Sequence, residues 1–131
     1  MTLPSNENTG EPGEPVFDPS QLAMLMEMEE EGDSSMVKEI TAQFVEDING
    51  VMACIEEAIK AGAFAQVAPA AHTIKGSAAT FGLLQVEQIA RELEAAGKDP
   101  AKYEAIPAIQ ERLRPAFAAG RAALEAYFEK R

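Results

Sequence analysis

The feature that most constrains how this chain can fold is the helical spacing of its apolar residues. Between residues 35 and 61, apolar side chains recur in steps of three or four, with mostly acidic and polar side chains between them. Such steps place side chains on one face of an α-helix, whereas a half-buried strand alternates at every second residue. The pattern predicts one long amphipathic helix over 35–61. Its apolar positions are Val37, Ile40, Phe44, Ile48, Val51, Ile55 and Ile59.

The same spacing predicts three further long helices, over 64–81, 84–96 and 103–128. Proline removes one backbone hydrogen bond, so Pro115 should bend the last of them. Pro69 either loosens the helix over 64–81 or marks a start of the regular helix near Val67. No segment alternates with period two, so we expect an all-α protein. Four amphipathic helices with short connections predict an antiparallel four-helix bundle. Glycines, which often end helices, follow three of the predicted helices: Gly62, Gly82 and Gly97.

A short additional N-terminal helix should precede the bundle. Asp18 and Pro19 are residue types favoured at the N-cap and at the first helical position. Before them, residues 1–15 hold three prolines and three glutamates with few apolar side chains, a composition typical of disorder. The total of 131 residues suits a single domain. We therefore predict a disordered tail over 1–15 and one domain over 16–131.

The charge of the chain excludes two classes of partner and points to one half of the sequence. With 22 acidic and 11 basic residues, the net charge is -11, whereas nucleic acids and anionic membranes bind clustered lysine and arginine. We expect neither as a partner. Residues 1–57 hold 14 acidic side chains and one basic, while residues 58–131 hold 8 acidic and 10 basic. A phosphate or an acidic partner should therefore bind the second half.

Cysteine and histidine usage limits the chemistry further. Cys54, the one cysteine, cannot form an internal disulfide, which fits a reducing compartment. No signal-like segment and no run of 18 apolar residues is present, so we expect a cytoplasmic location. His72 is the one histidine, which argues against the usual zinc sites and against a serine–histidine–aspartate triad. We expect no metal site and no cofactor.

His72 should face solvent. On a helical wheel, it lies roughly 140 degrees from the centre of the apolar face of the helix over 64–81. Gly76, one turn later, is costly inside a helix, and it would leave room beside the imidazole for a partner. Lys75 can reach the same side and neutralise an oxyanion. The other predicted neighbours on this face are small: Ala65, Ala68, Pro69 and Ala79.

Glu94 is a candidate partner for the imidazole. His72 lies ten residues before Gly82 and Glu94 twelve after it, so two antiparallel helices would bring them to the same level. The carboxylate could then accept the Nδ1 proton of His72 and leave Nε2 as a free nucleophile. A plain surface role for Glu94 fits the sequence equally well.

The segment over 71–82 carries a family resemblance. It reads AHTIKGSAATFG, with lysine and glycine three and four residues after the histidine and a second glycine ten residues after it. This resembles the signature of histidine-containing phosphotransfer (HPt) domains of two-component phosphorelays. The family often has an acidic or amide residue 22 positions after the histidine, where Glu94 stands here. The resemblance covers about residues 17–130.

The resemblance implies a phosphocarrier without an ATP site of its own, rather than an enzyme. His72 would accept a phosphoryl group from an aspartate of a hybrid histidine kinase's receiver domain and pass it to the receiver of a response regulator. Lys75 and Glu94 would assist, Mg²⁺ would sit on the receiver, and the chain would act as a monomer. The predicted docking residues are Gly76, Ala68, Ala79 and Gly82, although Gly82 also fits a simple helix cap. A non-catalytic helical adaptor that binds receivers or other signalling proteins is the alternative.

Overall fold

The structure, a computed structural model, describes residues 16–28 and 35–130. The predicted tail over 1–15 lies outside these residues. Short 3₁₀ segments over Phe64–Gln66 and Pro100–Ala105 precede the third and fifth helices. The helices are α1 (Ser20–Glu27), α2 (Ser35–Lys60), α3 (Val67–Phe81), α4 (Leu84–Gly97) and α5 (Ile106–Glu129).

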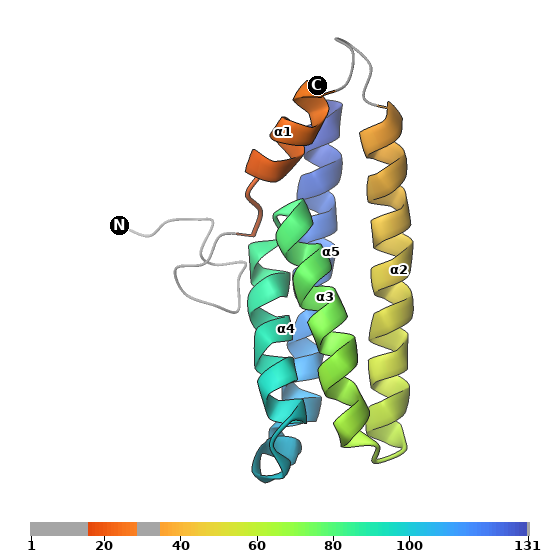
Figure 1. The fold of residues 1–131 in the computed structure, drawn as a ribbon, viewed down its shortest axis with the longest axis vertical. Coiled ribbons are helices and arrows are strands. Elements are labelled where there is room, and N and C mark those ends of the chain that lie inside the picture. The colour runs from red at the N-terminus through yellow and green to blue at the C-terminus, as the bar shows by residue number, and fades with distance from the viewer. Residues whose placement is uncertain (1–15, 29–34, 131) are drawn as a thin grey trace, which may run out of the picture.

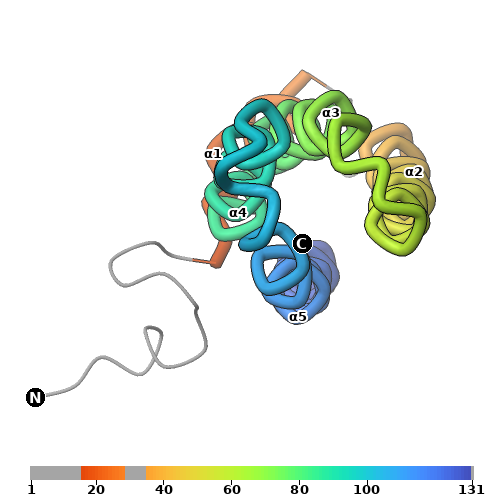
Figure 2. The backbone as a smooth tube through the Cα atoms, turned by 90° about the horizontal axis from the view of Figure 1, so that it is seen from below, coloured from red at the N-terminus to blue at the C-terminus, as the bar shows by residue number. Residues whose placement is uncertain are grey.

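The four long helices run alternately up and down, as Figure 1 shows, and form the predicted antiparallel bundle. Seen end-on, α3 lies between α2 and α4, and α5 packs beside α4 (Figure 2). Helix α1 covers the end of the bundle at which α2 begins and α5 ends. No strand is present in the described residues, and the predicted all-α class is confirmed. Within the same residues, no helix is long and apolar enough to cross a membrane.

The core forms where the apolar faces of the helices meet. The rings of Phe44 and Phe81 stack with centroids 4.2 Å apart, and Phe117 meets Phe44 edge-on at 6.1 Å. The predicted apolar face of α2 is partly wrong, since Ile40 is exposed while Thr41 is buried. Thr41 tolerates burial because its hydroxyl donates a hydrogen bond of 2.8 Å to the backbone carbonyl of Val37.

The two prolines disturb their helices less than the sequence suggests. Helix α3 begins at Val67, so Pro69 stands in its first turn, where backbone N–H groups have no partner within the helix. Of the two interpretations of Pro69, a start of the regular helix near Val67 is therefore confirmed, and Pro69 costs no helical hydrogen bond before His72. Pro115 lies on the exposed side of α5, and the helix continues across it.

The turn between α3 and α4 is fastened by the segment that leads into α1. Gly82 ends α3 with a left-handed backbone (φ +76°), as a helix C-cap. The backbone N–H of Asp18 donates to the Gly82 carbonyl at 2.8 Å, and that of Leu84 donates to the Val16 carbonyl at 3.2 Å. This turn sets the level at which α3 and α4 run past each other.

Candidate functional site

His72 projects from the middle of α3 into solvent. Its side chain is 66% exposed, whereas Ala71 and Ile74 beside it are fully buried. The predicted orientation is therefore confirmed. A helical face that turns away from the core leaves the imidazole open to a macromolecule.

Glu94 on α4 holds the imidazole from one side. Its Oε2 atom lies 2.9 Å from Nδ1 of His72, so the carboxylate meets the ring at the level that the sequence spacing predicts. The pKa of Glu94 is lowered to about 2, mainly by the hydrogen bond from Lys75, with further hydrogen bonds from His72 and Lys98 outweighing its burial. The carboxylate is therefore ionised at neutral pH and can only accept hydrogen bonds. In the neutral ring Nδ1 then carries the hydrogen, and Nε2 keeps a free lone pair.

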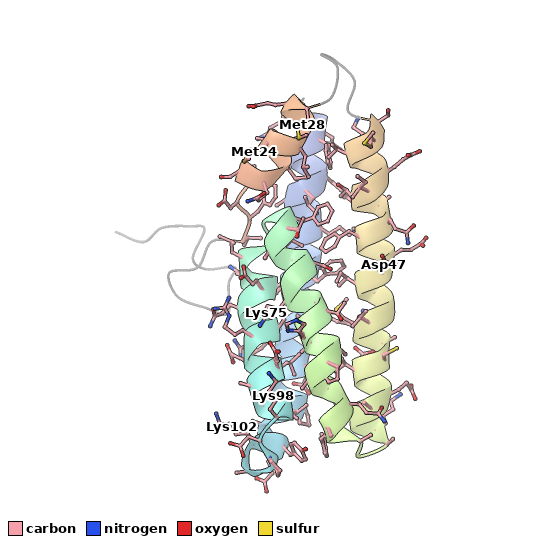
Figure 3. The ribbon with its side chains drawn as sticks, viewed as in Figure 1. Met24, Met28, Asp47, Lys75, Lys98 and Lys102 are labelled. Carbon is pink, nitrogen blue, oxygen red and sulfur yellow. The ribbon has the colours of Figure 1, made fainter. Side chains whose placement is uncertain are left out.

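Two lysines flank the carboxylate. Nζ of Lys75 donates to Oε1 of Glu94 at 2.6 Å, and Nζ of Lys98 lies 3.2 Å from Oε2. In Figure 3, Lys75 and Lys98 lie on one side of the molecule with Lys102, and Asp47 lies on the other. With the ring in its neutral form, the site combines a free nitrogen lone pair with two ammonium groups, an arrangement that suits a group carrying negative charge.

The sequence analysis did not identify Lys98. A signal for it was present, because a lysine four residues after a glutamate lies on the same helical face and commonly pairs with it. Lys98 directly follows the last residue of α4, where the sequence predicts only a helix end at Gly97.

The prediction that Ala68 belongs to the exposed face is wrong. Ala68 is only 7% exposed because it packs against Gly97, which is buried within α4 rather than placed after it. A Cβ atom on Gly97 would lie 2.8 Å from the backbone nitrogen of Ala68. The missing side chain therefore allows α3 and α4 to approach closely beside Glu94. A wheel for one helix cannot reveal this, since the neighbouring helix decides what is covered.

The remaining predicted docking residues divide into two kinds. Gly76 and Ala79 are exposed, and a Cβ atom on Gly76 would meet no atom within 4 Å. Gly82 is buried, and a Cβ there would collide with the Asp18 carbonyl oxygen, so its role is that of a cap. The open surface beside His72 therefore includes Gly76 and Ala79 but neither Ala68 nor Gly82.

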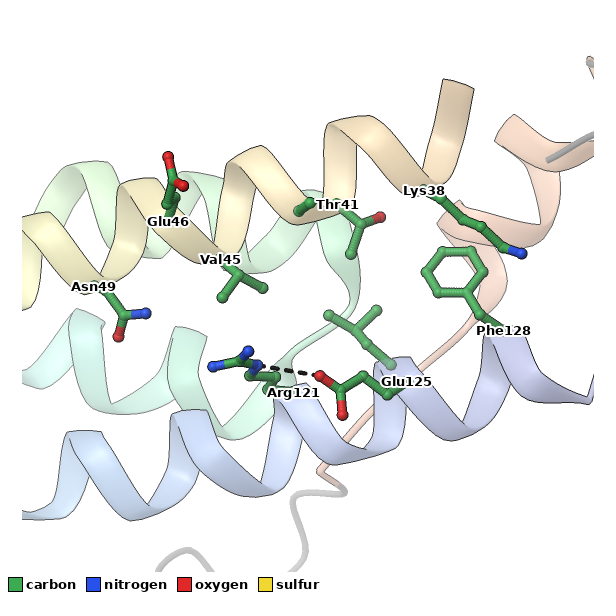
Figure 4. A pocket seen from close by; sticks show the side chains of 10 residues that line it. Lys38, Thr41, Val45, Glu46, Asn49, Arg121, Glu125 and Phe128 are labelled. Carbon is green, nitrogen blue, oxygen red and sulfur yellow. Dashed lines mark hydrogen bonds and ion pairs between the residues drawn. The ribbon is translucent and has the colours of Figure 1, made fainter. Parts of the chain in front are cut away.

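A hollow lies between α2 and α5, apart from the surface beside His72. Its volume is about 380 Å³, and an ion pair between Arg121 and Glu125 (3.2 Å) lies along it (Figure 4). It contains neither His72 nor the groups bonded to it. In the part of the chain that the structure describes, no three histidine, cysteine or acidic side chains gather in a way that could hold a metal ion.

Comparison with known proteins shows the family. The family model of the Hpt domain matches residues 39–126, which include His72, Lys75 and Glu94. The chain belongs to the Hpt domain family. As an Hpt domain, it has a phosphotransfer role in two-component signalling, and members of this family are phosphocarriers rather than kinases.

Two solved structures share the fold. Histidine-containing phosphotransfer protein B (HptB) from Pseudomonas aeruginosa PAO1 is 23% identical, with a TM-score of 0.78 over 89% of this chain and 97% of its own. Histidine-containing phosphotransfer protein MtHPt2 from Medicago truncatula is 19% identical, with a TM-score of 0.75 over 87% of this chain and 78% of its own. No curated protein matches the chain.

Proposed function

We propose that His72 is a phosphoryl carrier between two receiver domains, accepting the group from an aspartyl phosphate on one and giving it to an aspartate on the other. One observation carries the proposal. Nε2 of His72 is the exposed nitrogen of a ring whose Nδ1 is bonded to an ionised carboxylate. In its neutral form, the ring is therefore oriented with Nε2 as the nucleophile.

The transfer step follows from this arrangement. The lone pair of Nε2 attacks the phosphorus in line, an N–P bond forms, and the P–O bond to the aspartate breaks as its carboxylate leaves. The ring gains a positive charge, and Glu94 stabilises that charge through the Nδ1–H hydrogen bond. Attack by the second receiver's aspartate reverses these changes and restores the neutral ring.

Lys75 is the group best placed to meet the incoming phosphoryl oxygens. Its side chain lies one turn from His72 on α3, and it donates a hydrogen bond to Glu94 in the unphosphorylated protein. In this proposal the receiver's acidic residues hold the Mg²⁺, while the Hpt domain supplies the imidazole, the ammonium groups and the carboxylate. Gly76 and Ala79 form part of the surface on which the receiver docks.

The partners would be the receiver of a hybrid histidine kinase and that of a response regulator. The cytoplasmic location, the monomeric state and the lack of a resident cofactor stay predictions from the sequence. No observation favours the adaptor alternative, which would show as binding to a receiver without transfer.

The experiment is to incubate the protein with a receiver phosphorylated on aspartate and Mg²⁺. We expect the label to move to this chain and to be acid-labile and base-stable, as an N–P bond requires. His72→Gln should abolish the label while the circular dichroism spectrum stays unchanged, because the side chain is exposed. ATP with the protein alone should give no label. Label that persists in His72→Gln, or binding with no transfer, would refute the proposal.

A further inference from the structure

The two oxygens of Glu94 are held by different groups. Oε1 binds Lys75, while Oε2 is shared between Nδ1 of His72 at 2.9 Å and Nζ of Lys98 at 3.2 Å. Lys98 stands four residues after Glu94, and its own side chain is 66% exposed. Neither its position nor its exposure makes it part of the core. Its contact with the site is therefore the feature that distinguishes it from an ordinary surface lysine.

A glutamate with only one fixed oxygen does not have a fixed carboxylate plane. The terminal torsion of glutamate is broad and nearly two-fold, so the partners of its oxygens decide how the plane lies. Lys75 pulls Oε1 toward α3, and Lys98 holds Oε2 from its place just beyond the end of α4. With both ends held, Oε2 stays in line with Nδ1 of His72. With Lys98 removed, rotation about the Lys75 contact would weaken this hydrogen bond.

We propose that Lys98 is a positioning residue of the phosphotransfer site, an inference that rests on the proposed function of His72. It acts through Glu94 by keeping Oε2 on the Nδ1–H of His72. The hydrogen on the neutral ring is thereby confined to Nδ1, and Nε2 stays free to attack. Lys98 touches no reacting atom in this arrangement.

Lys102 offers a matched control. It is an exposed lysine on the same side of the molecule as Lys98 (Figure 3), and it is not among the groups that form an ion pair with Glu94. Lys102→Ala removes the same charge from the surface as Lys98→Ala. Any difference between the two variants therefore reports the contact with Glu94 rather than the general charge of the face. Lys98→Arg keeps a donor that can bind a carboxylate.

The first measurement is the ¹⁵N NMR spectrum of the His72 ring in the unphosphorylated protein. We expect wild type, Lys98→Arg and Lys102→Ala to show Nδ1–H as the main neutral form, and Lys98→Ala to show more Nε2–H. This measurement involves no receiver, so it judges Lys98 even if the proposed transfer fails. Identical spectra for Lys98→Ala and Lys102→Ala would overturn the inference.

The second measurement is the rate of phosphoryl acceptance from a phosphorylated receiver. Lys98→Ala should slow acceptance about two- to fivefold, the range that a half-exposed ion pair can supply. Lys98→Arg should restore most of the rate, and Lys102→Ala should leave it near wild type. Equal slowing in Lys98→Ala and Lys102→Ala would show that surface charge and not positioning is at work. Slowing in Lys98→Arg as large as in Lys98→Ala would refute a role for the contact with Glu94. Absence of transfer in the wild type would refute the proposed function instead.

Discussion

The α3/α4 and α2/α5 interfaces use similar ion pairs but differ in how closely their helices pack. Between α3 and α4, Gly97 lies directly against the backbone of Ala68. Between α2 and α5, hollows of about 380 Å³ and about 370 Å³ follow the two helices. The same bundle is thus tightly packed on the side that carries the imidazole and loosely packed on the other.

The difference in packing affects how exposed the ion pairs at the two interfaces are. Glu56 on α2 binds Arg114 on α5 through two hydrogen bonds of 2.7 and 3.1 Å, yet its side chain is 36% exposed. Glu94 is 11% exposed and binds three groups. An exposed ion pair contributes little and moves readily, whereas a covered carboxylate needs its partners in place. Close packing therefore turns a common surface interaction into a fixed support for His72.

The largest expected effect comes from filling the close approach at Gly97. In Gly97→Ala, the new Cβ would press on the Ala68 backbone, which has no flexible end to move aside. Overpacking of this kind should lower the free energy of unfolding by about 1–3 kcal/mol. The control is Gly50→Ala on α2, where the new Cβ would meet no atom within 4 Å. This substitution should raise the free energy of unfolding by about 0.5–1 kcal/mol.

Urea denaturation measures whether Gly97→Ala lowers and Gly50→Ala raises the free energy of unfolding. Because Glu94 stands three residues before Gly97, Gly97→Ala should also slow phosphoryl transfer, while Gly50→Ala should not. Stabilisation by both substitutions would show that the α3/α4 interface is no tighter than the surface of α2.

The next effect concerns access to His72. Gly76→Gln and Gly50→Gln both place a long side chain in open space on a helix, and each should stabilise its helix by up to about 1 kcal/mol. Gly76→Gln stands one turn from the imidazole and should slow transfer from a receiver about tenfold, since small displacements of reacting groups carry large rate costs. Gly50→Gln should transfer at the wild-type rate. Stopped-flow transfer assays measure both, and equal rates would argue against a docking face at Gly76.

The smallest expected effect is a difference between the pKa values of Glu94 and Glu56, which shows when the pH is lowered. The pKa of Glu94 is lowered from 4.5 to about 2, mainly by the hydrogen bond from Lys75, and that of Glu56 is lowered mainly by its hydrogen bonds from Arg114. A depressed folded-state pKa contributes stability above the unfolded value, and that contribution is lost as the pH falls through the folded value. For Glu94 the loss should occur between pH 4.5 and about 2. Carboxyl ¹³C NMR titration should find the pKa of Glu94 below that of Glu56. The reverse order would mean that the hydrogen bonds from Lys75, His72 and Lys98 do not outweigh the burial of Glu94.

Much of the fold was predictable because each long helix has its own apolar period and a glycine or a short connection after it. It was also predictable that His72 and Glu94 lie at the same height along α3 and α4. Counting residues from a tight turn needs only the helical rise. The burial of Ala68, the role of Gly97 and the contact of Lys98 were not. All three depend on how α4 approaches α3, and no period within one helix contains that information.

The most direct test of the central claim is ¹⁵N and ³¹P NMR of the protein after it has received a phosphoryl group from a receiver. We expect phosphorus to be coupled to Nε2 of His72, with Nδ1 still bearing the hydrogen that it shares with Glu94. Phosphorus bonded to Nδ1, or carried on any other side chain, would contradict the account.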